Sequence, residues 1–228
     1  MTHILDGKAL GLRIQNKIRL RVQKLSTKPG LAILLVGDDP ASHTYVALKQ
    51  KACERAGIHF ELFLYSSEES EETLLKKIQE LNARKDIHGI LVQLPLPTQN
   101  ATRIISAIDP LKDVDGFHPE NLQKLKEHKP ALISAVALGV IRLIRESVGT
   151  GPLPPTALIV SSPLFAQPLE FLLTESGVNS KVVQAEYPQL SQETLQADIL
   201  IVAEGIPGLI TKDMVKPGAI VIDVGTTR

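Results

Sequence analysis

The stretch LAILLVGDDP, residues 31–40, decides the fold class of this chain. Its first six residues are all apolar, which is typical of a parallel strand that is buried on both faces. Gly, Asp and Pro then end the strand in a loop. Residues 43–56 have the apolar spacing of a helix, with Ser42 as the expected N-cap and Gly57 after the last residue. A buried strand that leads directly into a helix predicts a parallel α/β fold.

Strand-like and helix-like segments alternate along the rest of the chain. Strands are expected over residues 60–65, 89–94, 157–161, 181–184, 199–203 and 219–224, and helices over residues 1–18, 71–83, 136–146, 164–175 and 191–196. Residues 149–155, GTGPLPP, are dominated by Gly and Pro and form the clearest linker candidate. The sequence therefore predicts two α/β domains around a cleft, residues 1–148 and 149–228, the second with its own βαβ unit.

Composition narrows the class of partner. In 228 residues, 25 Lys and Arg balance 25 Asp and Glu, so the net charge favours neither nucleic acid nor an anionic membrane surface. No apolar run approaches the roughly 18 residues of a membrane span, the N-terminus lacks the layout of a signal peptide, and the single Cys53 suits a reducing compartment. The six histidines lack metal-ligand spacing, so no metal site is expected. We expect a cytoplasmic protein that acts on small molecules.

Polar side chains gather at the ends of the expected N-terminal strands. Tyr45 and Lys49 lie four residues apart on a predicted helix and therefore share one face. Gln93 lies at the end of a strand, and Asp113 and Asp115 flank a valine in a short loop. These groups can converge at the rim of one sheet, where they suit a flat, hydrogen-bonding heterocycle. Each of them alone is more typical of a solvated helix face, a strand cap or a turn than of a functional site.

Four longer stretches carry a family resemblance. They read VGDDPASHTYVALKQKACERAGI at 36–58, IHGILVQLPLP at 87–97, PLKDVDGFHPENLQKL at 110–125 and QADILIVAEGIPGLITKDMVKPGAIVIDVGTTR at 196–228. In wording, order and spacing the chain resembles the bifunctional methylenetetrahydrofolate dehydrogenase/methenyltetrahydrofolate cyclohydrolase family over nearly its whole length. The resemblance implies a folate-binding first domain, a Rossmann-like second domain that binds NADP, tetrahydrofolate derivatives as substrates, and a homodimer.

The resemblance also implies a role for each polar residue. Tyr45 would stack on the folate ring system, and Gln93 would hold Lys49, the central catalytic residue of the cyclohydrolase step. Asp115 would bind the pterin edge. The remaining substrate contacts would come from Val92 and Leu94. Burial beside a cationic methenyl group lowers the pKa of a lysine, so its neutral amine can act as a general base near neutral pH.

The nucleotide-binding loop departs from the family pattern. The family begins this loop with Gly-Arg-Ser and has a second Gly before a Pro, whereas residues 160–168 read VSSPLFAQP. Val160 and Ala166 thus replace glycines that let phosphates approach the backbone. Ser161 replaces an arginine suited to a 2′-phosphate, and Glu186 adds negative charge where that phosphate would lie.

These changes predict that the dinucleotide binds weakly or not at all. A carboxylate can accept a hydrogen bond from a ribose 2′-hydroxyl, which leaves NAD open beside NADP. The cofactor contacts that remain are expected at Ser161, Ser162 and Thr226.

Two further departures concern the cleft. Where the family has Pro-Cys-Thr-Pro, residues 134–137 read SAVA, which is compatible with a helix. The family continues past the strand at 219–224 with a segment that forms one wall of the folate cleft, whereas this sequence ends at Arg228. Three functions therefore stay open: the full bifunctional enzyme, a cyclohydrolase with a defective dinucleotide site, and a non-catalytic folate-binding or dimer-partner protein.

Overall fold

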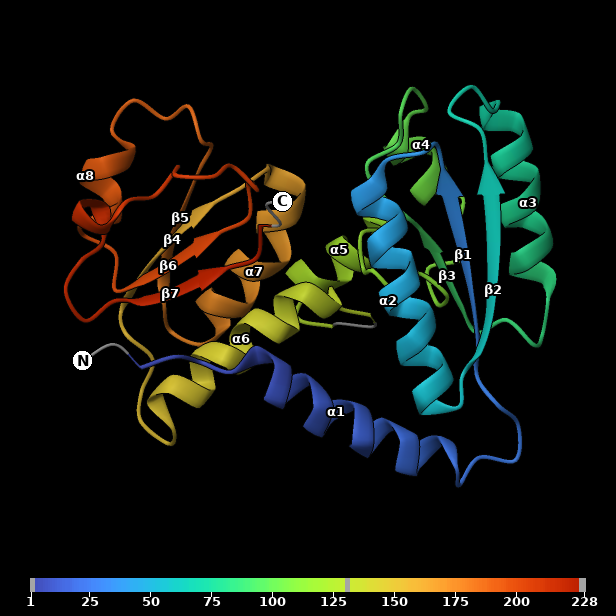
Figure 1. Ribbon diagram of the computed structural model, residues 1–228, viewed down its shortest axis with the longest axis horizontal. Coiled ribbons are helices and arrows are strands. Elements are labelled where there is room, and N and C mark those ends of the chain that lie inside the picture. Colours follow the sequence, from blue (N-terminus) through green and yellow to red (C-terminus); the bar gives the residue numbers. More distant parts are fainter. Residues whose placement is uncertain (1–2, 130–131, 226–228) are drawn as a thin grey trace. The chain divides into compact units, whose positions relative to one another are not determined.

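The chain folds into two α/β units. The computed structural model describes residues 3–129 and 132–225 (Figure 1). One unit comprises Asp6–Leu132, and the other comprises Ile133–Arg228 together with Met1–Leu5. The sequence places the domain boundary after residue 148, at the Gly/Pro-rich stretch, whereas the packing divides the chain before Ile133. The difference arises because the helix that precedes the stretch packs on the second sheet.

The first unit is built on a three-stranded parallel sheet with the strand order β2-β1-β3. Helix α2 covers one face, over a core that includes Ile33, Leu35 and Val46. Helices α3 and α4 cover the other face, over a core that includes Leu34 and Ile78. The elements are α1 (Gly7–Val22), β1 (Gly30–Val36), α2 (Pro40–Ala56), β2 (His59–Tyr65), α3 (Glu71–Ala83), β3 (Gly89–Val92), α4 (Ala101–Ile105) and α5 (Pro119–Lys126).

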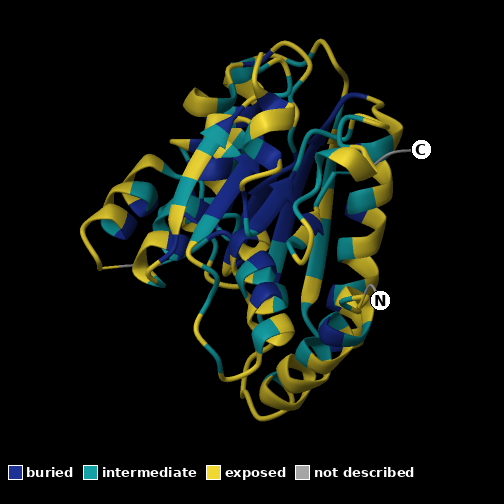
Figure 2. Ribbon diagram, turned by 90° about the vertical axis from the view of Figure 1, so that its left-hand side faces the viewer, coloured by how far each residue is buried: buried dark blue, intermediate teal, exposed yellow. Residues whose placement is uncertain are grey.

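The second unit has a four-stranded parallel sheet with the strand order β5-β4-β6-β7. Helices α6 and α7 pack on one face, around Ile159 and Ile201. Helix α8 and the 3-10 turn η1 pack on the other face, around Leu158 and Leu200. The elements are α6 (Ala135–Val148), β4 (Thr156–Val160), α7 (Pro163–Glu175), β5 (Asn179–Val183), α8 (Leu190–Thr194), β6 (Ile199–Val202), η1 (Lys212–Met214) and β7 (Ile220–Asp223). Figure 2 shows the buried residues gathered in the strands.

The apolar patterns predicted the sheets better than the helix starts. Helix α3 has the predicted bounds, and α6 begins inside the SAVA stretch with Ser134 as its N-cap. The expected N-cap of α2, Ser42, is wrong: Asp39 caps this helix, because its carboxylate accepts the N–H of Ser42 at 2.8 Å. Helices α4 and α5 were not expected. Within residues 3–129 and 132–225, no helix is long and apolar enough to cross a membrane.

The turn between β1 and α2 sets the position of the helix that carries Tyr45 and Lys49. Gly37 has φ +81, a backbone conformation that favours glycine, and a Cβ there would lie 2.9 Å from the Pro97 side chain. The loop after β3 therefore closes directly on this turn. As a result, the start of α2 and the end of β3 lie at the same edge of the sheet.

Candidate active site

A hydrogen bond joins the two elements that carry the predicted catalytic pair. Lys49 is half-buried on α2, and its Nζ donates to Gln93 Oε1 at 2.9 Å. Gln93 is only 9% exposed, and its Nε2 donates to the backbone carbonyl of Leu94 at 2.8 Å, which fixes which end of the amide faces the lysine. Tyr45 lies one turn before Lys49 and is also half-buried. The expected contact between Lys49 and Gln93 is thus present.

The two aspartates of the loop at 113–116 have different surroundings. Asp113 is 2% exposed and forms an isolated parallel bridge to Ile90 on β3. Its carboxylate accepts the backbone N–H groups of Gly116 at 3.2 Å and His118 at 2.8 Å. Asp115 is partly exposed and interacts electrostatically with Lys49. The loop therefore uses Asp113 to hold its own shape, whereas Asp115 influences Lys49 through its charge.

Burial favours the neutral forms of both Lys49 and Asp115. It lowers the pKa of Lys49 from its ordinary value, and the Asp115 carboxylate partly opposes this shift. It raises the pKa of Asp115, while Lys49 opposes the shift and Asp113 adds to it. A lysine with a lowered pKa, held by an amide oxygen, is suited to act as a general base.

The other two predicted substrate contacts, Val92 and Leu94, differ in how deeply they are buried. Val92 is 4% exposed, and its side chain packs in the core under α3 and α4, so only its backbone is left for a ligand. Leu94 is half-buried beside Gln93, and its carbonyl accepts the Gln93 amide. Sequence reasoning missed Asn121, which is fully buried on α5 and bonds to Asp113 at 3.1 Å. The only sequence signal for it was its place in the stretch that follows the two aspartates.

In the second unit, the replaced glycines do not obstruct the turn between β4 and α7. Val160 is the last residue of β4 and packs in the core with Leu158, and Ala166 packs in the core on the opposite face. Their side chains therefore point into the protein and do not fill the turn, and the weaker dinucleotide binding expected from the sequence stays a prediction. Ser162 precedes α7 and makes no capping hydrogen bond, and Pro163 occupies the first turn, where its lack of an N–H costs least. The start of α7 thus fits a pyrophosphate.

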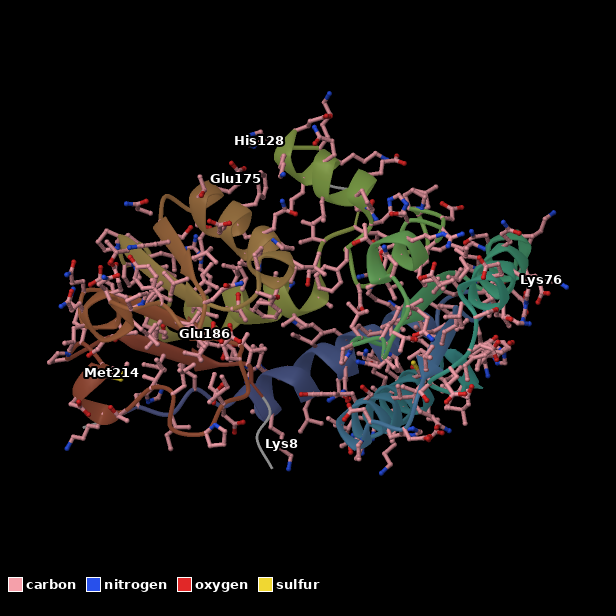
Figure 3. The ribbon with its side chains drawn as sticks, turned by 90° about the horizontal axis from the view of Figure 1, so that it is seen from above. Lys8, Lys76, His128, Glu175, Glu186 and Met214 are labelled. Atoms are coloured by element: carbon pink, nitrogen blue, oxygen red, sulfur yellow. The ribbon has the colours of Figure 1, made fainter. Side chains whose placement is uncertain are left out.

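The surroundings of this turn offer little positive charge for a 2′-phosphate. Ser161, at the position of the family arginine, is fully buried, and its hydroxyl donates to the Ser162 carbonyl. Beside it lies an open hollow of about 500 Å³ whose one basic lining residue, Lys181, is paired with Glu193 at 2.6 Å. Glu186, labelled in Figure 3, is exposed in the loop after β5. The third expected contact, Thr226, lies outside the described residues.

Known proteins resemble the chain over both units. The family model of the tetrahydrofolate dehydrogenase/cyclohydrolase catalytic domain matches residues 5–115, and the model of the family's NAD(P)-binding domain matches residues 133–228. The bifunctional protein FolD of Bordetella bronchiseptica is 44% identical over 230 residues, which cover 99% of this chain and 81% of that protein.

Solved structures resemble the fold as a whole. The FolD methylenetetrahydrofolate dehydrogenase/cyclohydrolase of Campylobacter jejuni has a TM-score of 0.89 and 38% identity, over 98% of this chain and 81% of that one. The enzyme of Trypanosoma brucei, solved with NADP and an inhibitor, has a TM-score of 0.92 and 31% identity, over 99% of this chain and 80% of that one.

Proposed function

The chain belongs to the tetrahydrofolate dehydrogenase/cyclohydrolase family, and we propose that Lys49 is the general base of its cyclohydrolase step. The family resemblance, at 41 to 44% identity to bifunctional relatives, identifies it as a methylenetetrahydrofolate dehydrogenase/cyclohydrolase of one-carbon metabolism. The observation that carries the proposal is the 2.9 Å hydrogen bond from the half-buried Lys49 to Gln93. No feature of the described residues favours a cyclohydrolase-only or non-catalytic protein.

The proposed chemistry begins with a neutral Lys49 amine. It accepts a proton from a water molecule whose oxygen adds to the cationic methenyl carbon of the folate. The carbon–nitrogen bond of the ring then breaks as the carbonyl of a formyl group forms. The hydroxyl proton of the adduct is lost, and the Lys49 ammonium is placed to protonate the departing nitrogen. The net products are a formyl-tetrahydrofolate and one proton, so water is the only co-reactant.

The neighbouring side chains would position the reacting groups. Gln93 accepts from Lys49 and so directs its Nζ toward the substrate. Tyr45 would stack on the flat ring system, and Asp115 would accept from N–H groups at the pterin edge.

In the second unit, we propose NAD over NADP as the preferred dinucleotide. When bound, a nicotinamide dinucleotide supplies the hydride acceptor for the dehydrogenase step. The start of α7 and the Ser162 hydroxyl would hold the pyrophosphate. The preference is supported by the buried Ser161 in place of an arginine, the pairing of Lys181 with Glu193, and the nearby carboxylate of Glu186.

Two assays test the enzyme directly. The hydrolytic step is followed by the loss of methenyl absorbance, with wild type compared with Lys49→Ala. Equal rates would remove the catalytic role proposed for Lys49. The dehydrogenase step is followed by nicotinamide reduction from methylenetetrahydrofolate, with NAD and NADP in separate titrations. A higher kcat/KM with NADP would contradict the proposed preference.

The expected homodimer and cytoplasmic location stay predictions. The family resemblance is the only support for the dimer, and analytical ultracentrifugation of the purified chain at micromolar concentration tests it. A single species with the mass of one chain, 24.8 kDa, would contradict it.

A further inference from the structure

The loop that carries Asp115 is clamped firmly at its start. The Lys112 ammonium donates to the three carbonyls of Leu81, Asn82 and Arg84, at 3.1, 2.8 and 2.7 Å. These carbonyls lie at the C-terminal end of α3, where a helix leaves its backbone acceptors unpaired and favours positive charge. The residues before Asp113 are therefore fixed to α3, and the position of Asp115 depends on what holds the turn after them.

That turn is held by the carboxylate of Asp113. It accepts two backbone N–H groups of the turn itself, those of Gly116 and His118. Its one side-chain partner among the described residues is Asn121, whose Nδ2 donates to Asp113 Oδ2 at 3.1 Å. An almost fully buried carboxylate needs such donors, because water cannot reach it. The hydrogen-bond pattern of Asp113 thus sets the course of the chain through Asp115.

Asn121 makes this contact although one of its own buried polar atoms stays unpaired among the described residues. It is 0% exposed, and its Nδ2 also donates to the carbonyl of Pro110 at 2.8 Å. Its Oδ1 is buried and has no partner among the described residues, an arrangement that costs free energy. Turning the amide over would place this oxygen against the Pro110 carbonyl and the Asp113 carboxylate, which are both acceptors. The side chain therefore serves as a double donor that joins the start of the loop to the turn.

From this geometry we propose that Asn121 is a positioning residue, which holds the turn that carries Asp115 in place through its hydrogen bond to Asp113. The inference rests on the proposed role of Asp115 in binding the pterin edge. Among the described residues, Asn121 makes no hydrogen bond to Lys49 or Gln93, so its effect on the site is indirect.

The test replaces Asn121 with leucine, which has a similar volume and removes both donors together with the unpaired oxygen. The first readout is the titration of Lys49 by NMR of ¹³C-labelled lysine side chains, with the Lys49 signal identified by its absence in Lys49→Arg. If the turn relaxes and Asp115 moves away, Lys49 loses a neighbouring negative charge. We then expect it to titrate at a lower pH in Asn121→Leu than in wild type.

The second readout is the folate KM of the hydrolytic step, which we expect to rise about tenfold in Asn121→Leu, with a smaller fall in kcat. Asp115→Asn is made alone and together with Asn121→Leu. If Asn121 acts through Asp115, the double variant has the KM of Asp115→Asn, whereas multiplied effects of the two substitutions would overturn the proposal.

Gln99→Met is the matched control. Gln99 is 8% exposed, and its Nε2 donates to the two carbonyls of Ser67 and Glu69, away from the turn at Asp113. This variant loses a buried double donor of the same kind, so we expect lower stability with an unchanged Lys49 titration. If both variants alter the Lys49 titration equally, Asn121 has only a general structural role.

A second variant and a measurement that needs no activity complete the test. If Asn121→Leu does not fold, Asn121→Ser, which keeps one donor on a smaller side chain, is expected to lower the Lys49 titration by a smaller amount, and an unchanged titration overturns the proposal. If wild type and Lys49→Ala hydrolyse the methenyl bridge at equal rates, the proposed function fails. The NMR titration needs no activity and still decides whether Asn121 positions Asp115.

Discussion

Lys49 and Gln93 lie 44 residues apart in the sequence, and a 2.9 Å hydrogen bond joins them across the gap between helix α2 and the end of strand β3. The bond has a defined direction, because the Gln93 amide is anchored at its other end to the Leu94 carbonyl. Lys49 is half-buried, and this contact holds its Nζ at the end of β3.

Replacing Gln93 with methionine should therefore lower kcat more than it raises KM. The substitution keeps the length and most of the volume but removes the acceptor of Lys49. A hydrogen bond of a neutral amine contributes about 0.5–1.5 kcal/mol, so we expect kcat of the hydrolytic step to fall about twofold to tenfold. Steady-state kinetics on the methenyl substrate measure it. Gln50→Met, on the exposed face of the same helix, should behave as wild type.

The pH dependence of hydrolysis should reveal Lys49 as a base with a lowered pKa. Activity requires the neutral amine, so kcat falls as pH drops through the pKa of Lys49, and burial moves that fall below the range of an ordinary lysine. Asp115 opposes the shift. Asp115→Asn should therefore move the acidic limb of the kcat profile to still lower pH. An acidic limb that stays in place, or moves upward, would mean that another group is the base.

An ion-pair network at the other end of the first sheet should make stability depend on acid. The Arg84 guanidinium pairs with Glu61 at 2.6 Å and, together with His59, lowers the pKa of Glu61 from 4.5 to about 2. A depressed pKa in the folded state means that the contribution is complete above about pH 4.5 and is lost as pH falls toward 2. Because both side chains are partly exposed, we expect about 1 kcal/mol or less.

Denaturant unfolding followed by circular dichroism between pH 2 and pH 6 measures this contribution. Glu61→Gln should flatten the loss of stability with acid over that range. The control is Glu68→Gln, which removes an exposed carboxylate from the loop between β2 and α3. An equal flattening in both variants would show that net charge, and not the Arg84 pair, causes the effect.

Gly89 lies directly against the Asp113–Asp115 loop, and we expect that no larger residue is tolerated there. A Cβ on this glycine would lie 2.5 Å from Cγ1 of Val114, the residue between the two aspartates. Gly89→Ala should therefore cost about 1–3 kcal/mol in stability and weaken folate binding, because the loop must move to make room. Calorimetric titration with a folate checks the second effect. Gly139→Ala, in α6 with nothing within 4 Å, should instead be neutral or stabilising by up to about 1 kcal/mol.

How much of the fold and of the candidate site the sequence predicts depends on whether a run or a regular spacing of residue types marks the feature. Continuous apolar runs such as residues 31–36 and 199–202 predicted the central strands, since a strand buried on both faces needs no alternation. The spacing of Tyr45 and Lys49 placed them on one face, and the end of β3 placed Gln93 near them. Which of Asp113 and Asp115 holds the turn follows from local hydrogen bonds and has no periodic signal.

In the nucleotide loop, the directions of two side chains could not be predicted from the sequence. A glycine replaced by a larger residue predicts a blocked phosphate site only if the new side chain faces the ligand. Val160 ends a strand and Ala166 lies on the buried face of α7, so both side chains point into cores. The direction in which a side chain points at the end of a strand depends on its register with β5 and β6, which the sequence of the loop does not contain.

Charge near the end of β5 should determine which dinucleotide binds better. Glu186 is exposed in the loop after β5, and the lining of the adjacent hollow contributes Lys181 already paired with Glu193. A 2′-phosphate would therefore meet a carboxylate with little compensating positive charge, whereas a 2′-hydroxyl can donate a hydrogen bond to it.

Glu186→Ser should raise the affinity for NADPH about threefold to tenfold and leave the affinity for NADH equal or lower. Titration of nicotinamide fluorescence at low salt measures both constants, and the NADPH gain should shrink as salt is added. Glu175→Ser removes another exposed carboxylate, from the far end of α7. If it produces the same gain, the effect belongs to the total charge of the unit, and the proposed preference for NAD loses its local cause.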